Sequence, residues 1–175
     1  MSKRAGNQGV IRLTMPADLR YRDVAVRAVA EACRLVSRNR YAHGSHPRVH
    51  HSATTTQTLD LSDRFAAEVV SAVSEIFNNI AIHGYGGEGT GDVTLEMRIR
   101  GDRLVIVISD QGSAFDPSQV PLPELDALPE GGMGIHIARA CMDELDYTPG
   151  PPNVWRMTKY TAGSMRRPRR VSSPT

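Results

Sequence analysis

Glu75, Asn79 and His83 follow one another at four-residue steps within a stretch of helical pattern. Residues four apart on an α-helix differ by only about 40° around its axis, so these side chains share one ridge. An Asn amide oxygen can ligate Mg²⁺, a hard cation that holds phosphate groups, and a carboxylate one turn earlier can orient or deprotonate an attacking hydroxyl. The ridge could therefore support phosphoryl transfer. Taken alone, it is explained more simply as an acid and an amide on a solvated helix face.

A second group, Asp110-Gln111-Gly112, comes directly after the most apolar strand pattern of the chain, Leu104 to Ile108. An Asp at the end of a buried strand costs free energy unless it is hydrogen-bonded. The exocyclic amine of an adenine is one partner that would satisfy it, and Gly112 would let a base approach the backbone. An ordinary Asp/Gly turn at a strand end is the alternative.

A third group, Gly131-Gly132-Met133-Gly134, leads into a helical pattern that starts at Ile135. Glycines at a helix entrance leave backbone N–H groups free at the positive end of the helix dipole, where phosphates bind. The group lacks the Gly-Lys-Ser/Thr of a Walker A loop and does not follow a strand, as a Rossmann fingerprint must. It predicts a phosphate cradle, with a plain glycine-rich loop as the alternative.

These groups need helices and strands to position them, and the periodicity of the apolar residues predicts which. Helices on one side of a largely antiparallel sheet make a two-layer α+β sandwich. The predicted strands are Val10–Met15, Val93–Arg100, Leu104–Ile108 and Val154–Tyr160, and the predicted helices run from about Val24 to Ser37, from Ser62 or Asp63 to Gly84, and from Gly134 to Leu145.

The chain has 175 residues, which is enough for one domain with its own core. We expect a flexible start over residues 1–9, the domain over 10–160 with an extended polar loop at 38–58, and a disordered tail over 161–175. Four of the 21 Lys and Arg residues lie in that tail, which leaves 17 basic against 19 acidic residues in the rest. A body of this charge does not indicate a nucleic-acid partner.

Cys33 and Cys141 are the only two cysteines, and each lies within an apolar helical pattern. Two buried thiols fit a reducing compartment better than a disulfide framework or a metal site. No stretch approaches the roughly 18–20 uninterrupted apolar residues that span a bilayer, and no apolar run follows the first charged residues as in a signal peptide. We therefore expect a cytoplasmic protein that does not bind membranes.

The order of these features along the chain is the pattern of the GHKL ATPases. From about Val10 to Tyr160 the chain resembles more closely the anti-sigma-factor serine/threonine kinases of bacterial partner-switching systems. The stretches that carry the resemblance are Ser74-Glu75, Asn79, His83-Gly84-Tyr85, Glu130-Gly131-Gly132-Met133-Gly134-Ile135, Cys141-Met142-Asp143-Glu144-Leu145 and Met157-Thr158-Lys159-Tyr160.

This resemblance implies the Bergerat fold and a kinase that uses ATP and Mg²⁺. Such a kinase phosphorylates a Ser or Thr of a small STAS-type anti-sigma-factor antagonist, and alternatively sequesters a sigma factor. Glu75 would be the general base, Asn79 the Mg²⁺ ligand, and Asp110 the residue that recognises adenine, with Thr158 near the base.

The resemblance also implies that Gly112 shapes the base pocket. Gly131, Gly132, Met133 and Gly134 would surround the phosphates, chiefly through their backbone N–H groups. Partners would bind the first helix and the loop after it, and a homodimer would form near the first strand.

The chain departs from some of these kinases just before the glycine-rich turn. Where they carry a basic residue, this chain has Leu128-Pro129-Glu130. A nucleotide-dependent partner-binding switch without phosphoryl transfer is therefore one alternative, although the presence of Glu75 favours the kinase. A stand-alone histidine-kinase-type ATPase domain is the other; the short lid from Asp116 to Glu130 and the lack of a preceding phospho-accepting helix speak against it.

Overall fold

The computed structural model describes residues 9–41, 63–87, 89–100, 102–114, 133–162 and 164. The first eight residues, the predicted lid, Gly131, Gly132, and most of the predicted polar loop and basic tail lie outside these ranges. The first helix is longer than the sequence pattern predicts, because it continues to Tyr41 rather than ending near Ser37.

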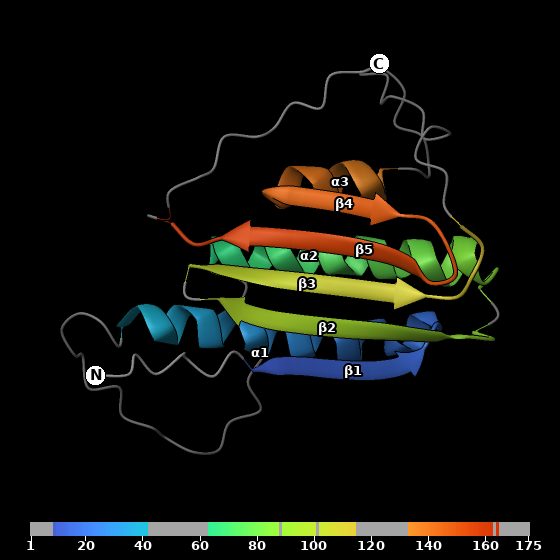
Figure 1. The fold of residues 1–175 in the computed structure, drawn as a ribbon, viewed down its shortest axis with the longest axis horizontal. Helices are drawn as coiled ribbons and strands as arrows, with labels where there is room; N and C mark the ends of the chain where they lie inside the picture. Colours follow the sequence, from blue (N-terminus) through green and yellow to red (C-terminus); the bar gives the residue numbers. More distant parts are fainter. Residues whose placement is uncertain are drawn as a thin grey trace, which may run out of the picture.

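The described elements form two layers, one of strands and one of helices (Figure 1). The five strands are hydrogen-bonded in the order β1-β2-β3-β5-β4, and every neighbouring pair is antiparallel. Helices α1 and α2 lie behind the sheet in the view of Figure 1, and α3 lies beside the β4 edge. The predicted α+β class is therefore confirmed. In chain order the elements are β1 (Val10–Pro16), a 3₁₀ turn η1 (Leu19–Tyr21), α1 (Arg22–Tyr41), α2 (Arg64–Asn79), a π-helical turn η2 (Ile80–Gly84), β2 (Asp92–Arg100), β3 (Arg103–Asp110), α3 (Gly134–Cys141), β4 (Glu144–Thr148) and β5 (Asn153–Tyr160).

Helix α2 is the central helix of the core. Asp63 caps its start, since the Asp63 carboxylate accepts a hydrogen bond from the Phe65 amide at 3.0 Å. The apolar positions recur at helical spacing and are buried. The stretch Arg64–Gly84 is long and apolar enough to cross a membrane, but 56% of its most apolar window is buried within the protein, which identifies a core helix. Its buried residues are Ala66, Val69, Val70, Ala72, Val73, Ile76 and Phe77.

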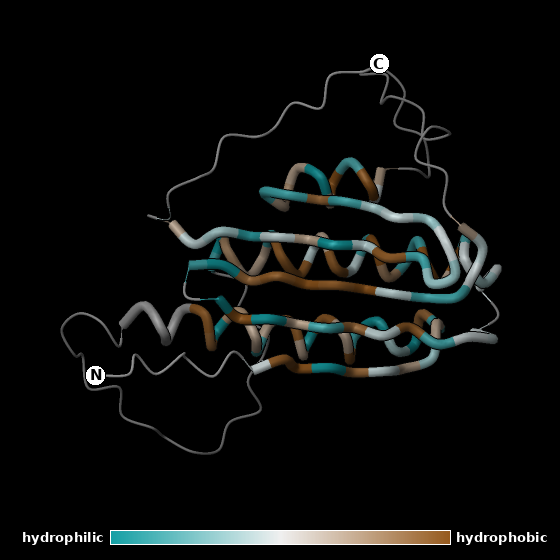
Figure 2. Tube along the Cα trace, viewed as in Figure 1, coloured by the Kyte–Doolittle hydropathy of each residue, from teal (hydrophilic) through white to brown (hydrophobic). Residues whose placement is uncertain are grey.

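The sheet contributes the other half of the core through alternate residues. Every second side chain of β3, from Leu104 to Asp110, is buried, and the intervening residues are half-buried. Figure 2 shows the hydrophobic middle of β3 and the hydrophilic ends of β2 and β3 at their shared turn. Burying an Ile or Leu side chain stabilises a fold by about 1.5–3 kcal/mol. The unbroken apolar run of β3 is thus fully buried on one face only, the face that α1 and α2 cover.

The structure corrects the prediction for the segment after α3. The helix ends at Cys141, and Met142 has extended backbone angles (φ −100°, ψ 150°). Glu144–Thr148 forms strand β4, which pairs with β5. Leu145 and Tyr147 alternate as half-buried residues, and Tyr147 packs on Trp155 with ring centroids 4.4 Å apart. Pairing with the next strand, β5, rather than local helix propensity, decides this segment.

Candidate functional site

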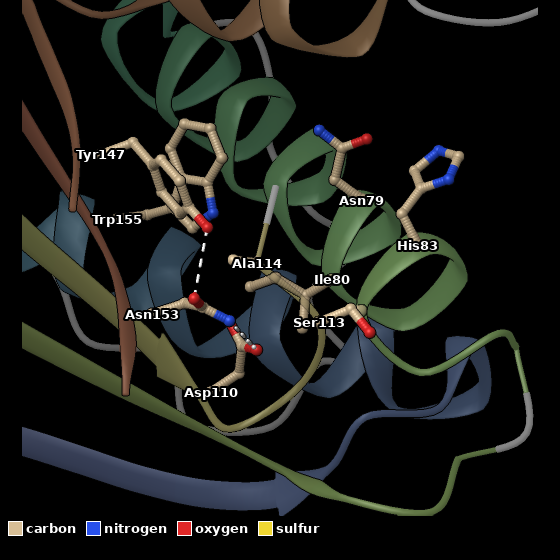
Figure 3. Close-up of a pocket in the computed structure, with 10 residues that line it drawn as sticks. Asn79, Ile80, His83, Asp110, Ser113, Ala114, Tyr147, Asn153 and Trp155 are labelled. Carbon is tan, nitrogen blue, oxygen red and sulfur yellow. Dashed lines mark hydrogen bonds between the residues drawn. The ribbon is translucent and has the colours of Figure 1, made fainter. Parts of the chain in front are cut away.

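A pocket opens where β3 and β5 meet the last turns of α2 (Figure 3). It contains about 310 Å³ of empty space, part of it open to solvent. Its walls come from η2, from the segment after β3 and from the paired strands β4 and β5. The residues that line it are Asn79, Ile80, His83, Gly84, Asp110, Ser113, Ala114, Tyr147, Asn153 and Trp155.

Asp110 lies on the inner face of the sheet at the end of β3, directly opposite Asn153 in the β3–β5 register. It is only 4% exposed. Its Oδ1 accepts hydrogen bonds from the Gly112 amide at 2.9 Å and from Asn153 Nδ2 at 3.1 Å. No described residue donates to its Oδ2. A buried carboxylate with one unused oxygen can bind a ligand that brings its own N–H donor.

Asn153 holds Asp110 in this position, and the sequence pattern did not identify it. Its Oδ1 accepts hydrogen bonds from the Gly150 amide at 3.1 Å and from the Tyr147 hydroxyl at 3.3 Å. Since both groups are donors here, the amide nitrogen must point the other way. There it reaches Asp110 and the carbonyl oxygen of Gly112, at 2.9 Å from the latter. Asn153 therefore fixes the direction of the unused Asp110 oxygen.

Gly112 lies where a side chain would not fit. A Cβ atom there would lie 2.7 Å from the carbonyl oxygen of Gly84 and 3.0 Å from the Tyr85 ring. Ser113 adds a backbone hydrogen bond to the same Gly84 oxygen at 2.9 Å. The end of η2 and the segment after β3 are thereby held together, while the role of Gly112 in shaping a base pocket stays a prediction.

The Tyr85 hydroxyl also connects the turn after η2 with the segment after β3. It accepts a hydrogen bond from the Gln111 amide at 2.9 Å and donates one to the carbonyl oxygen of Asp92 at 3.4 Å. Burial raises the pKa of Tyr85, so the phenol stays protonated and can donate. The sequence offered only its place after His83-Gly84, which does not reveal this contact.

Asn79 lies at the transition from α2 to the π-helical turn η2, and it lines the pocket (Figure 3). Turns of π-helix are rare and are found often at functional sites. The Asn79 amide makes no hydrogen bond with a described residue, and its Nδ2 is buried. Buried polar groups normally have partners, so the unpaired Nδ2 donor fits a residue that contacts a ligand with an acceptor atom.

Glu75 lies one turn before Asn79 and faces the start of α3. A Cβ atom on Gly134 would lie 2.6 Å from Glu75 Oε2, so the two helices meet closely at this point. Met133 caps α3, and its carbonyl oxygen accepts a hydrogen bond from the Ile137 amide at 2.9 Å. The first amides of α3 therefore lie beside a carboxylate at the positive end of the helix dipole.

The structure does not bring Thr158 to this pocket. Thr158 lies opposite Val105 in the sheet, five residues along β5 from Asn153. Because side chains alternate along a strand, Thr158 lies on the other face from Asn153 and Trp155. Asn153 occupies the position opposite Asp110, and only the register of the two strands reveals this. Gly131 and Gly132 lie outside the described residues.

Comparison with known proteins identifies relatives of the chain. It is 34% identical over 100 residues to the serine-protein kinase RsbW of Bacillus velezensis, which covers 53% of this chain and 62% of that protein. It is 34% identical over 108 residues to the anti-sigma F factor of Thermoanaerobacter sp. strain X514, which covers 58% of this chain and 75% of that protein. The chain thus spans somewhat over three fifths of the RsbW relative.

The fold has a counterpart among solved structures. The RsbU and RsbW domains of a Mycobacterium tuberculosis protein match it with a TM-score of 0.50 and 15% sequence identity, covering 87% of this chain and 32% of that one. The sequence profile of the histidine kinase-like ATPase domain matches residues 15–159. This match covers most of the chain, which therefore belongs to the histidine kinase-like ATPase domain family.

Proposed function

We propose that the chain is an ATP-dependent serine/threonine protein kinase and an anti-sigma factor. It phosphorylates a small STAS-type anti-sigma-factor antagonist and, in the alternative complex, sequesters a sigma factor. The observation that supports this most directly is the buried Asp110, which lines the pocket with Asn79 and whose Oδ2 receives no hydrogen bond from a described residue. The relatives named serine-protein kinase and anti-sigma factor support the two activities.

The adenine end of the site is formed by Asp110, Asn153 and Gly112. The free Asp110 oxygen accepts a hydrogen bond from the exocyclic amine of adenine, while Asn153 keeps the carboxylate in place. The rings of Tyr147 and Trp155, tilted by 36° to each other, form an apolar wall of the same pocket. A pocket that offers an acceptor at this point binds adenine in preference to guanine, which carries a carbonyl oxygen there.

Asn79 would hold Mg²⁺ through its amide oxygen, which accepts no hydrogen bond from a described residue. The described residues contain no group of three or more His, Cys, Asp or Glu side chains that could hold a metal ion without other ligands. Phosphate oxygens and water would complete the ligand set. When bound, Mg²⁺ neutralises charge on the phosphates.

Glu75 accepts the proton of the attacking Ser or Thr hydroxyl, as the general base. Its carboxylate faces the start of α3. Met133 and Gly134 would present backbone N–H groups to the phosphates, as the sequence pattern predicts also for Gly131 and Gly132. Positioning and charge stabilisation of this kind account for most of the catalysis of phosphoryl transfer.

The proposal includes a cytoplasmic location and self-association. Cys33 and Cys141 are free thiols, which suit a reducing compartment. Strand β1 is at the edge of the sheet, and its residues Val10 and Ile11 are 49% and 37% exposed. An exposed edge with apolar residues supports a homodimer that forms near β1.

A nucleotide-dependent switch without phosphoryl transfer is the second candidate. It is favoured by Leu128-Pro129-Glu130, where no basic residue is available to the terminal phosphate. In this case ATP would change the affinity for a protein partner, and Glu75 would have no chemical role.

Transfer of radiolabelled phosphate from ATP to the antagonist encoded nearest to the gene separates the two candidates. The kinase transfers label to a Ser or Thr, and Glu75→Gln abolishes transfer while ATP binding is retained. Asp146→Asn, which removes one carboxylate charge from an exposed residue of β4, leaves transfer intact. Tight ATP binding without transfer in the unmodified chain would refute the kinase and leave the switch.

A further inference from the structure

The outer face of the sheet, the face turned away from α1 and α2, carries a hollow lined with arginines. Its lining residues are Arg98 and Arg100 of β2, Arg103 and Val105 of β3, and Arg156 of β5. We call this feature the arginine hollow. It contains about 740 Å³ of empty space and is open to solvent. No described helix covers it (Figure 1).

Of the four arginines of the arginine hollow, only Arg98 forms an ion pair with a described residue. Arg98 pairs with Glu96 at 2.9 Å, yet its Nε is buried without a partner. Arg103 lies over the Tyr160 ring, 5.5 Å from its centroid, which leaves its charge in place. Arg100 and Arg156 form no ion pair with a described residue. Guanidinium groups bind carboxylates in a bidentate way, so this hollow is suited to an anionic partner.

Acidic residues on the same face limit the size of that partner. Asp146 of β4 lies opposite Arg156, and Glu144 lies two residues away on the same strand. Together with Glu96, these carboxylates flank the hollow and repel a long polyanion such as nucleic acid. A second copy of the chain, placed with the same face inward, would bring like charges together. These two occupants are therefore disfavoured.

The dimensions of the arginine hollow fit an α-helix. Its arginines project from three adjacent strands, which together span about 10 Å, close to the diameter of a helix with its side chains. Each of these strands is paired on both sides. A partner therefore cannot add a strand here and has to bind through side chains.

We propose that the arginine hollow binds an acidic helical segment of a protein partner. Carboxylates along one face of that helix meet Arg100, Arg103 and Arg156, and apolar atoms contact Val105. The hollow is near the Arg103 end of β3 on the outer face, whereas the nucleotide pocket is near the Asp110 end on the inner face. A partner bound here leaves the nucleotide pocket open, and this proposal does not depend on kinase activity.

The test uses the full chain and a labelled helical peptide of about 15 residues with glutamates along one face. We expect it to bind, and the same peptide with glutamines not to bind, by fluorescence anisotropy. The double variant Arg100→Gln with Arg156→Gln should weaken binding at least about tenfold. The matched double variant Arg27→Gln with Arg139→Gln, which has the same net charge, should bind as the unmodified chain does. Both doubles should keep the melting temperature and ATP affinity of the unmodified chain.

If the first double variant melts at a lower temperature, the peptide affinities of the single variants Arg100→Gln and Arg156→Gln are compared with that of the unmodified chain instead. Equal loss in the two doubles would overturn the proposal, because it would show a response to net charge alone. Equal binding of the glutamine peptide would overturn it as well. So would binding of inorganic triphosphate or of a DNA oligonucleotide through these arginines without binding of the acidic peptide.

Discussion

Replacing Asn153 by alanine tests the central contact of the candidate site. The substitution removes two donated hydrogen bonds, to Asp110 and to the Gly112 carbonyl oxygen, and two accepted ones, from Tyr147 and Gly150. Asn153 is 2% exposed, so water cannot freely replace these contacts. A hydrogen bond to a charged group contributes about 1.5–3 kcal/mol, and each buried group left without a partner costs about 1–3 kcal/mol. We expect a loss of about 3–4 kcal/mol of unfolding free energy.

The same substitution should weaken ATP binding, because Asp110 is then free to turn its carboxylate away from the position where we propose that adenine binds. A loss of at least about tenfold in affinity corresponds to about 1.4 kcal/mol. Urea unfolding measures the stability, and titration with a fluorescent ATP analogue, at temperatures where the variant is folded, measures the affinity. Discrimination between ATP and GTP should fall in the same titration.

Thr148→Ala is the matched control, since Thr148 is an exposed residue of the neighbouring strand β4. Surface substitutions of this kind change stability by no more than about 0.5 kcal/mol. The reasoning is refuted if Asn153→Ala is as stable as Thr148→Ala and binds ATP with unchanged affinity and selectivity. Reduced stability with unchanged nucleotide selectivity would leave Asn153 a structural role and refute its role in positioning Asp110.

Three further predictions concern other parts of the fold. Gly112→Ala places a methyl group 2.7 Å from a backbone oxygen at the end of η2, and such overpacking should cost about 1–3 kcal/mol in thermal unfolding; an unchanged melting temperature would contradict the close approach. Burial raises the pKa of Glu68, but hydrogen bonds from Lys159 and Arg64 outweigh this and hold it below the ordinary 4.5. Because the pKa of Glu68 is lowered in the folded state, the stability that its ion pairs contribute is present above about pH 4.5 and is lost as the pH falls through the folded pKa. Glu68→Gln should therefore make the free energy of unfolding less dependent on pH in the acid range. An unchanged pH dependence would contradict the pairing. Burial raises the pKa of Cys33 to about 12, so a maleimide at pH 8 should label it only after unfolding, and rapid labelling of the native thiol would contradict its burial.

The sequence by itself determined most of the elements and the local motifs. Apolar residues at helical spacing fixed α2, with Asp63 as its cap, because the buried stripe and the cap are both properties of neighbouring residues. Strict alternation fixed β2 in the same way. Asp110 and Gly112 were identified because they directly follow a buried strand.

The tertiary structure alone decided which distant residues meet. Asn153 faces Asp110 through the pairing of β3 with β5, and a register of strands cannot be read from either strand separately. The same register places Thr158 on the opposite face of the sheet. Strand β4 forms because Leu145 and Tyr147 pack beside β5, although the segment continues a helical pattern.

Two other features were also beyond the sequence. Tyr85 reaches Gln111 across 26 positions, and only the folded turn brings its hydroxyl to that amide. The four arginines of the arginine hollow come from three strands and gather because those strands are neighbours in the sheet. Local patterns report which face of an element is apolar, since that depends on adjacent residues. Which partner covers that face depends on the free energy of packing over the whole chain, and only the structure reveals it.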